Sequence, residues 1–254
     1  MNLFFSVITV VFNDKSGFTT TKASISKQSY KHFEWIVVDG GSLDGTAEEV
    51  MRLHSPTIKR ISEADGGIYD AMNKGVALAS GEYVVFMNAG DVFSSPDVLQ
   101  LVYDKLLLQE KNIEVLFGGA NLIFDDDSMK YRKPRKSSDT IWHGLPATHQ
   151  ATYYRGNFIR KNPYDLQYKM CGDYFLTATV VVEHGEEAYI DKPLVDFRIG
   201  DFSFQNPLMA LTEAYMIQKT VLHSPLPLRV ISFIRRIAAI SAVYILFQRR
   251  KFKR

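Results

Sequence analysis

Apolar runs alternate with segments of helical periodicity along the first part of the chain. LFFSVITVVF, at residues 3–12, is a continuous β-branched and aromatic run, as expected of a strand buried on both faces of a parallel sheet. The predicted strands are residues 3–12, 33–41, 57–63 and 82–88, and the helices predicted between them are residues 18–29, 42–54 and 67–80. This alternation predicts an α/β fold with a doubly wound, mostly parallel sheet, whose ligands bind at the carboxyl ends of the strands.

The alternation weakens after Asp91. A helix is expected near residues 96–110, followed by a strand, IEVLFGG, and an antiparallel hairpin with three aspartates at its tip, which we interpret as a solvated turn. Further along, ATYYRG predicts a strand, DYFLTATVVVEHG a helix, and EEAYIDKPLVDFRIG two short strands broken by Pro193. The second half therefore predicts a smaller, antiparallel portion of the sheet.

Acidic residues stand at the ends of three predicted strands. Asp39, Asp65 and Asp91 follow the second, third and fourth strands, so all three are expected along one edge of the sheet. A single aspartate at such a position usually makes a turn. Three of them at the ligand-binding edge indicate a site.

Charge is distributed unevenly. The net charge is +2, but the segment after Pro225 holds eight bases and no acid, so the remainder of the chain is at about −6. This asymmetry argues against a body that binds nucleic acid. These bases are Arg229, Arg235, Arg236, Arg249, Arg250, Lys251, Lys253 and Arg254.

Cysteine content and the first residues bear on the compartment. Cys171 is the only cysteine, which excludes an internal disulfide and fits a reducing compartment. MNLFFSVITVVFND has no basic stretch and no small-residue cleavage site, so it predicts a buried strand and not a signal peptide. We therefore expect a cytoplasmic protein.

The common phosphate-binding motifs are absent from the sequence. The chain has no G-x-x-x-x-G-K-[ST], and no G-x-G-x-x-G follows the first strand, so neither a P-loop nor a usual dinucleotide fold is expected. Carboxylates at strand ends are poor partners for a diphosphate unless a divalent cation, Mn²⁺ or Mg²⁺, lies between them. Asp91 is the natural direct ligand for such a cation.

Four separated motifs occur in order: SVITVVFND, WIVVDGGSLDGT, SEADGGIYDAMNKGVALASGEYVVFMNAGD and CGDY. Together they resemble the family 2 glycosyltransferases, over roughly residues 3 to 200. The resemblance implies the GT-A fold, an inverting transfer from a nucleotide-diphosphate sugar, and an acceptor side built from the smaller antiparallel portion. Within the family the motifs look most like bacterial exopolysaccharide enzymes, such as the colanic acid glycosyltransferases.

The resemblance places the nucleotide on the first half of the chain. Asp39 matches the aspartate that hydrogen-bonds the base. The other matching positions are Thr9, Val11 and Asn13 in the nucleotide pocket, Asp65 near base and ribose, and Lys74 near phosphate.

The resemblance also suggests the catalytic groups. Asn88 to Asp91 matches the metal-binding Asp-x-Asp element, with Asn88 in place of the first acid, which implies modest metal affinity or a ribose contact by the amide. Asp173 matches the general base, although an aspartate there could equally cap the helix that follows, a contribution of about 1 kcal/mol. His149 is a candidate for acceptor or metal contact or a core residue, and Arg198 for phosphate contact or a solvated side chain.

The end of the chain predicts a separate segment. Residues 1–224 form the predicted catalytic domain, and residues 225–254 a basic amphipathic tail. Its longest uncharged run is too short to span a bilayer, which takes about 20 apolar residues. An interfacial helix with a polybasic end fits the anionic inner face of the cytoplasmic membrane, where a lipid-linked acceptor would be met. A helix packed on the body is the alternative.

Two other functions stay open from the sequence. One keeps the fold without activity, as a nucleotide-sugar-binding subunit, and Asn88 permits it. The other is a sugar-phosphate nucleotidyltransferase, which would require a Gly-rich, basic loop after the first strand, where VVFNDKSGF is a poor match.

Overall fold

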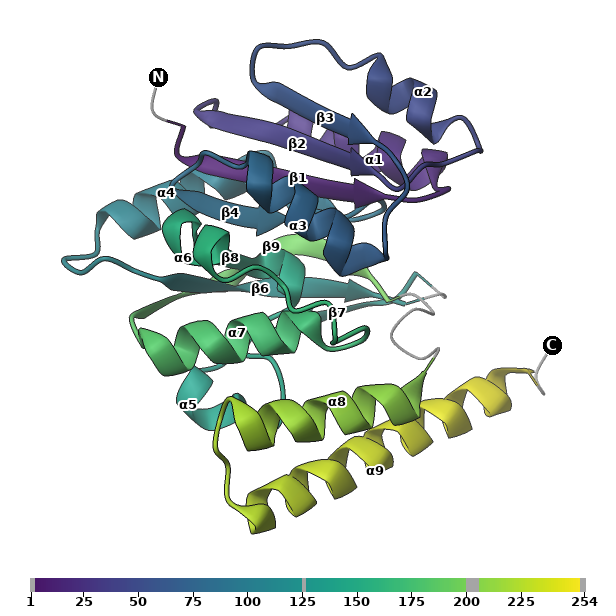
Figure 1. The fold of residues 1–254 in the computed structure, drawn as a ribbon, viewed down its shortest axis with the longest axis vertical. Coiled ribbons are helices and arrows are strands. Elements are labelled where there is room, and N and C mark those ends of the chain that lie inside the picture. Colours follow the sequence, from purple (N-terminus) through teal and green to yellow (C-terminus); the bar gives the residue numbers. More distant parts are fainter. Residues whose placement is uncertain (1–2, 125–126, 200–205, 252–254) are drawn as a thin grey trace.

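The computed structural model describes residues 3–124, 127–199 and 206–251. Among these, the strands form one sheet in the order β3-β2-β1-β4-β8-β6-β9-β5, with β7 paired to β6 (Figure 1). The strands are β1 (Phe5–Val11), β2 (Phe33–Asp39), β3 (Ile58–Ser62), β4 (Tyr83–Phe86), β5 (Val92–Phe93), β6 (Val115–Ile123), β7 (Met129–Arg132), β8 (Thr152–Arg155) and β9 (Glu187–Arg198). The helices are α1 (Lys15–Ser26), α2 (Thr46–Met51), α3 (Ile68–Leu78), α4 (Val98–Leu107), α5 (Ser137–Thr140), the 3-10 turn η1 (His149–Ala151), α6 (Gly156–Lys161), α7 (Gly172–Glu183), α8 (Pro207–Thr220) and α9 (Leu226–Lys251).

The first four predicted strands pair in parallel, as expected. β1 lies between β2 and β4, and every residue of β1 is buried, because helices cover both faces of the sheet. Apolar side chains of α1, α2 and α4 form the core on one face, and those of α3, α6 and α7 form the core on the other (Figure 1). The sheet is therefore doubly wound.

The second half adds antiparallel strands. β8 runs antiparallel to both β4 and β6, so β6 points the same way as β4. β7 folds back on β6 as the predicted hairpin. The short strand β5 was not predicted from the sequence, and it pairs antiparallel with β9. The outcome is a mixed sheet with a parallel half and a largely antiparallel half.

One prediction about this half is wrong. Residues 187–198 form a single strand, β9, and not two strands broken by Pro193. Pro193 faces Gly119 at an irregularity in the β6–β9 register, where a residue without an N–H does not interrupt the pairing. The bulge therefore keeps the strand continuous.

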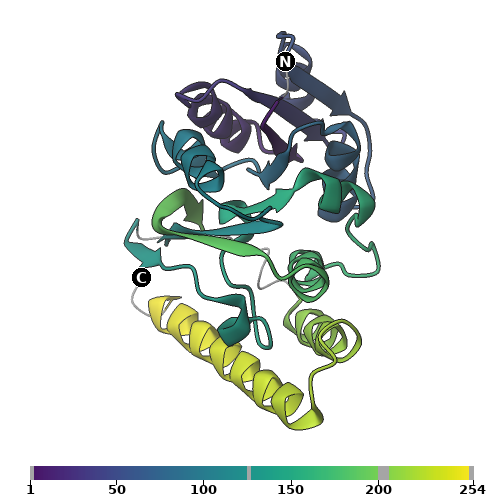
Figure 2. The ribbon, with the colours of Figure 1, turned by 90° about the vertical axis from the view of Figure 1, so that its left-hand side faces the viewer.

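Helices α8 and α9 form a hairpin at the end of the molecule opposite β1–β3 (Figure 2). The Gln218 side chain donates to Ser232 Oγ over 2.7 Å in the buried seam between them. Arg229 donates to the Tyr215 hydroxyl over 3.1 Å. One side of the predicted tail therefore packs on the protein, as the alternative prediction held. Among the described residues, no helix is both long and apolar enough to cross a membrane.

Candidate active site

The carboxyl ends of β1 to β4 meet at one edge of the sheet because these strands are parallel. Val11 at the end of β1 is in register with Asp39 at the end of β2, and Asp39 is in register with Ser62 at the end of β3. The loops after these strands therefore converge, and they carry four of the predicted site residues, Asn13, Asp65, Asn88 and Asp91.

Asp39 is fully buried, and only one of its two carboxylate oxygens has hydrogen-bond partners. Its Oδ2 accepts hydrogen bonds from Ser62 Oγ at 2.7 Å, Ser42 N at 3.1 Å and Gly41 N at 3.2 Å. Its Oδ1 is shielded from solvent and has no partner among the described residues. Because a buried acceptor without a donor is costly, this oxygen is suited to an N–H of a bound ligand.

Asp65 and Phe12 lie against the same turn. A Cβ built on Gly40 would be 2.5 Å from Asp65 Oδ2 and 3.3 Å from the Phe12 ring. Asp65 Oδ1 accepts from Gly67 N at 2.9 Å, which shapes the start of α3. Phe12 is 64% exposed, so its ring offers a surface on which a planar base can stack. Nothing in the sequence marks Phe12 for this position, because it is the last residue of an apolar run.

The three β1 positions differ in what they present. Thr9 is fully buried, and its hydroxyl accepts from Trp35 Nε1 at 2.9 Å, so its side chain belongs to the core. Val11 is buried at the edge itself. Asn13 is exposed, and its Oδ1 accepts from Leu43 N at 2.8 Å, which ties the loop after β1 to the loop after β2. Val11 and Asn13 therefore lie at the carboxyl edge of the sheet, and the Thr9 side chain lies in the core.

Lys74 is engaged within the protein. Its Nζ lies 2.7 Å from Glu63 Oε1 and donates to the Ala64 carbonyl over 2.9 Å, and Asp70 is 3.8 Å away. The hydrogen bond to Glu63 raises the pKa of Lys74. Lys74 therefore fastens the loop before Asp65 to α3, and a phosphate contact would require it to leave Glu63.

The Asn88–Asp91 segment is a tight turn that is hydrogen-bonded to Thr21 of α1. Asp91 N donates to the Asn88 carbonyl over 3.0 Å, and Thr21 Oγ1 donates to the Asp91 carbonyl over 2.7 Å. The Asp91 carboxylate is 6% exposed and accepts from Gln150 Nε2 at 3.0 Å. Burial raises the pKa of Asp91 to about 7. Asn88 Oδ1 is buried and has no partner in the described structure.

This turn provides few ligands for a divalent cation. No cluster of three or more His, Cys, Asp or Glu side chains that could hold a metal occurs among the described residues. The unpartnered Asn88 Oδ1 and the Asp91 carboxylate are hard oxygen donors of the kind that Mg²⁺ and Mn²⁺ take. The residues therefore fit a cation that has few protein ligands and takes the rest from substrate and water.

Asp173 lies in the first turn of α7, at the same edge. The segment before it is fixed by Glu213 of α8, whose carboxylate accepts from Lys169 N, Met170 N and Cys171 N at 2.8–2.9 Å. Tyr69, at the start of α3, donates to the Met170 carbonyl over 3.2 Å. The beginnings of α3 and α7 are therefore held together, and Asp173 is brought beside the loops that carry Asp65.

The surroundings of Asp173 tune its acidity. Burial raises the pKa of Asp173 to about 6, while Tyr174 N, which donates to Oδ1 over 2.7 Å, and the charges of Arg236 and Arg132 act in the opposite direction. The residue before α7 is Cys171, and no side chain caps the helix there. Asp173 is therefore not an N-cap, and its half-buried carboxylate has a pKa of about 6. Sequence patterns give no sign of Arg132 and Arg236, which come from β7 and α9.

His149 lies in the core, and Arg198 lies at the end of β9. Burial lowers the pKa of His149 to about 3, its Nε2 lies 3.0 Å from the Tyr164 hydroxyl, and its ring stacks on Phe86 at 4.8 Å. His149 is thus a neutral core residue beside Gln150, the partner of Asp91. Arg198 ends β9 and pairs with Asp127 at 2.9 Å, with 55% of its side chain exposed.

A parallel half-sheet with carboxylates at its carboxyl edge, joined to an antiparallel half that brings in a further aspartate, is the GT-A architecture. The model of the family described as Glycosyl transferase family 2 matches residues 6–167, so the chain belongs to the family 2 glycosyltransferases and is a glycosyltransferase.

Relatives and solved structures agree. An uncharacterized glycosyltransferase of Mycobacterium tuberculosis is 32% identical over 182 residues, 70% of each chain. A PGL/p-HBAD biosynthesis glycosyltransferase of Mycobacterium bovis is 30% identical over 188 residues, covering 67% of this chain and 66% of the relative. Among solved structures, Staphylococcus aureus TarS with UDP superposes with a TM-score of 0.64 at 18% identity, covering 86% of this chain and 70% of TarS. A Pyrobaculum calidifontis mannosyltransferase with GDP-Man and Mn²⁺ gives 0.66 at 15% identity, covering 97% and 76%.

Proposed function

We propose that this glycosyltransferase is an inverting enzyme of bacterial surface polysaccharide synthesis, which moves a sugar from a nucleotide-diphosphate sugar to a lipid-linked saccharide acceptor. The observation that carries the proposal is the convergence of the unpartnered Asp39 Oδ1 and the half-buried Asp173 at one edge of the sheet. The first is suited to hold a nucleotide, and the second to take a proton.

The nucleotide is bound by the first three strands. Asp39 Oδ1 accepts an N–H of the base, and the exposed Phe12 ring stacks on its face. Asp65, beside both, faces the ribose. TarS has been solved with UDP and with UDP-GlcNAc, and the Pyrobaculum enzyme with GDP-Man, which supports a nucleotide-sugar donor.

Transfer is a single displacement. The acceptor oxygen forms a bond to the anomeric carbon on the face opposite the diphosphate, while the bond from that carbon to the diphosphate oxygen breaks. Asp173 takes the proton of the attacking hydroxyl, and general-base help of this kind is worth about 10² to 10⁴ in rate. With a pKa of about 6, Asp173 is mostly ionised at neutral pH and still basic enough to accept the proton.

We include a divalent cation in the proposal. Asn88 Oδ1 and Asp91 are the ligands that this chain offers, and the bound ion would supply Lewis-acid stabilisation of the departing diphosphate. Mn²⁺ is present in the Pyrobaculum enzyme and in a glucosyl-3-phosphoglycerate synthase of Mycobacterium tuberculosis with a TM-score of 0.57, which supports this assignment.

We also infer that the protein works as a peripheral protein on the cytoplasmic face of the membrane. The described part of α9 exposes a row of apolar side chains to solvent, and α8 adds more beside it. The residues concerned are Leu208, Met209 and Met216 of α8 and Val230, Ile231, Phe233, Ile234 and Ile237 of α9. Because the chain beyond them is rich in arginine and lysine, the pair of helices fits an anionic bilayer surface.

Isothermal titration with UDP and with GDP, each with and without Mn²⁺, tests the proposal. The wild type should bind one of the two nucleotides more tightly with Mn²⁺, and Asp91→Ala should lose the Mn²⁺ dependence. Asp173→Asn serves as the matched control, because it should bind the nucleotide as the wild type does. Absence of binding for both nucleotides in folded protein, with and without Mn²⁺, would show that the strand-end aspartates only make turns.

A further inference from the structure

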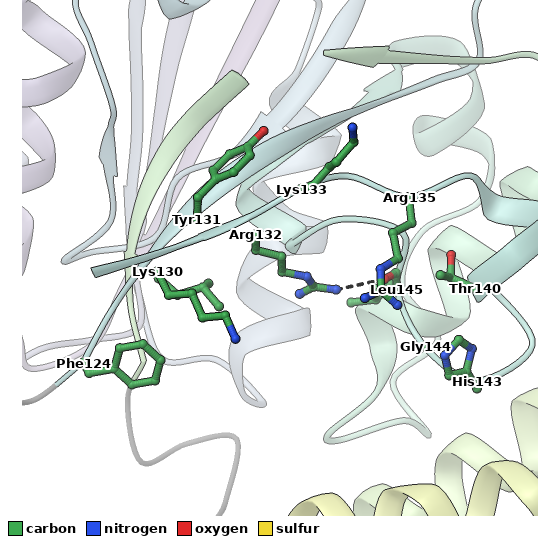
Figure 3. Close-up of a pocket in the computed structure, with 11 residues that line it drawn as sticks. Phe124, Lys130, Tyr131, Arg132, Lys133, Arg135, Thr140, His143, Gly144 and Leu145 are labelled. Atoms are coloured by element: carbon green, nitrogen blue, oxygen red, sulfur yellow. Dashed lines mark hydrogen bonds between the residues drawn. The ribbon is translucent and has the colours of Figure 1, made fainter. Parts of the chain in front are cut away.

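A basic pocket lies beside the site, between the β6–β7 hairpin and the segment around α5. Its volume is about 580 Å³. The charged side chains in its lining are Lys130, Arg132, Lys133 and Arg135, with His143 on the far wall (Figure 3). None of the described residues that line it is acidic.

The pleat of β7 divides its charges between two faces. Tyr131 donates to Asp191 over 2.9 Å and Lys133 pairs with the same carboxylate, so these two lining side chains point to the side of the hairpin opposite to Lys130 (Figure 3). Lys130 and Arg132 alternate with them and point the other way. Lys133 is therefore neutralised on one face of the strand, and the cations on the opposite face are not.

The inward cations have no salt-bridged acid in the described part of the chain, although the charge of Asp173 opposes the lowering of the pKa of Arg132 by burial. Arg132 Nη2 donates to the Leu145 carbonyl over 2.9 Å, and burial together with the neighbouring Arg135 lowers the pKa of Arg132. No ion pair with a carboxylate is found for Lys130, Arg132 or Arg135 among the described residues. A desolvated guanidinium beside two further cations is stabilised by a multiply charged anion with several acceptor oxygens.

The pocket adjoins both the proposed base and α9. Because β6 points the same way as β4, the hairpin stands at the edge that carries the site. Arg132 is close enough to Asp173 for each charge to shift the other's pKa. At the opposite wall, Arg235 of α9 lies over the Trp142 ring at 5.7 Å, next to His143.

We propose that this pocket binds the phosphate or diphosphate group of the acceptor. The acceptor is then a glycan attached to a phosphate-bearing carrier. The inference rests on the proposed function, since it assigns the acceptor side of the same site. An anion held by Lys130 and Arg135 would leave the saccharide beside Asp173, while an attached lipid chain would pass along the apolar surface of α8 and α9.

Titration with inorganic pyrophosphate and with geranyl diphosphate, at low salt, tests this assignment. The double variant K130Q/R135Q removes two inward cations and leaves Arg132, the neighbour of Asp173, in place. K133Q/K136Q is the matched control, because it removes the same charge from the same segment, from one lysine that Asp191 already neutralises and from one that does not line the pocket. Loss of two charge-assisted contacts should weaken diphosphate binding by about tenfold or more in K130Q/R135Q, and little in the control.

The outcomes are distinct. Equal weakening in both double variants, or no diphosphate binding by the wild type, overturns the pocket assignment. Tighter binding of geranyl diphosphate than of pyrophosphate indicates a lipid-borne group, and equal binding indicates that the anion alone is recognised. Parallel titration with UDP and GDP separates the two proposals, because both double variants should bind nucleotide as the wild type does. If neither nucleotide binds while K130Q/R135Q selectively loses pyrophosphate, the donor assignment fails and the anion pocket stands.

Discussion

Replacing Asp173 by asparagine distinguishes a catalytic base from a structural residue, because the two roles predict opposite changes in stability. The side chain is nearly isosteric, and its oxygen can still accept from Tyr174 N. The folded-state pKa of about 6, against 3.8 for an ordinary aspartate, corresponds to about 3 kcal/mol of unfavourable free energy for the ionised form. Asp173→Asn should therefore raise the free energy of unfolding at pH 8 by up to about 3 kcal/mol.

The sign of the pH dependence follows from the same shift. The folded protein binds more protons than the unfolded chain between pH 3.8 and about 6, so this group's contribution to stability falls as pH rises through that window. Denaturant titrations at pH 5 and pH 8 should show the gain in Asp173→Asn growing with pH. A helix cap would instead lose about 1 kcal/mol on substitution.

Activity should change in the opposite direction. Sugar transfer by Asp173→Asn should fall by about 10² to 10⁴. In the wild type, kcat/KM should rise with pH up to about 6 and then level, and this limb should be absent from the variant. Arg132→Gln removes a charge that favours ionised Asp173, so the rise of kcat/KM with pH should occur at higher pH in this variant. A variant that is less stable than the wild type and transfers sugar within a few-fold of its rate would refute the assignment.

Three further substitutions test the donor side. Phe12→Ala should weaken binding of the nucleoside diphosphate by about 1–3 kcal/mol, measured by titration, if the ring stacks on the base; unchanged affinity would remove Phe12 from the pocket. Asn88→Asp should tighten Mn²⁺ binding, followed by calorimetry, because it adds charge to an oxygen that lacks a partner; unchanged Mn²⁺ affinity with weaker nucleotide binding would point to a ribose contact instead. Asp91→Asn should raise the unfolding free energy of the metal-free protein at pH 8 but not at pH 4, because burial raises the pKa of Asp91 from 3.8 to about 7. This shift corresponds to a cost on the order of 4 kcal/mol for the ionised form. If the substitution changes the unfolding free energy equally at both pH values, Asp91 is not a buried, protonatable group.

The parallel half of the fold could be predicted because its signals are local. The buried strands are apolar runs, and an aspartate or asparagine at or just after the end of a parallel strand must lie at the ligand edge, as Asp39 and Asn88 do. It is harder to predict from the sequence to which face of the sheet a strand residue directs its side chain. Thr9 and Phe12 lie in the same run, yet Thr9 bonds Trp35 in the core and Phe12 is exposed. The pattern carries no mark of this difference, because both faces of β1 are buried.

The contacts that shape the acceptor side are all of long range. Glu213 holds the segment before α7 from some 40 residues away, and Pro193 fits at the register irregularity where it faces Gly119 of β6. Arg132 reaches Asp173 through the fold of the hairpin, with no spacing that would reveal it. Such contacts depend on how elements pack and not on the order of apolar and polar residues. The position of Asp173 could be inferred by resemblance, but its electrostatic environment could not.

The C-terminal helix connects this environment to the membrane surface that we propose. Arg236 lies 5.2 Å from the centre of the Tyr174 ring, next to Asp173, and lowers the pKa of that carboxyl. Glu213 of α8 fixes the segment that leads into Asp173, and α8 is itself joined to α9 through Gln218 and Ser232. The surface that would touch lipid and the group that would take the acceptor's proton are therefore parts of one packed unit. The packing of α9 therefore sets how far Arg236 lies from Asp173, and with it how strongly this charge lowers the pKa of the proposed base.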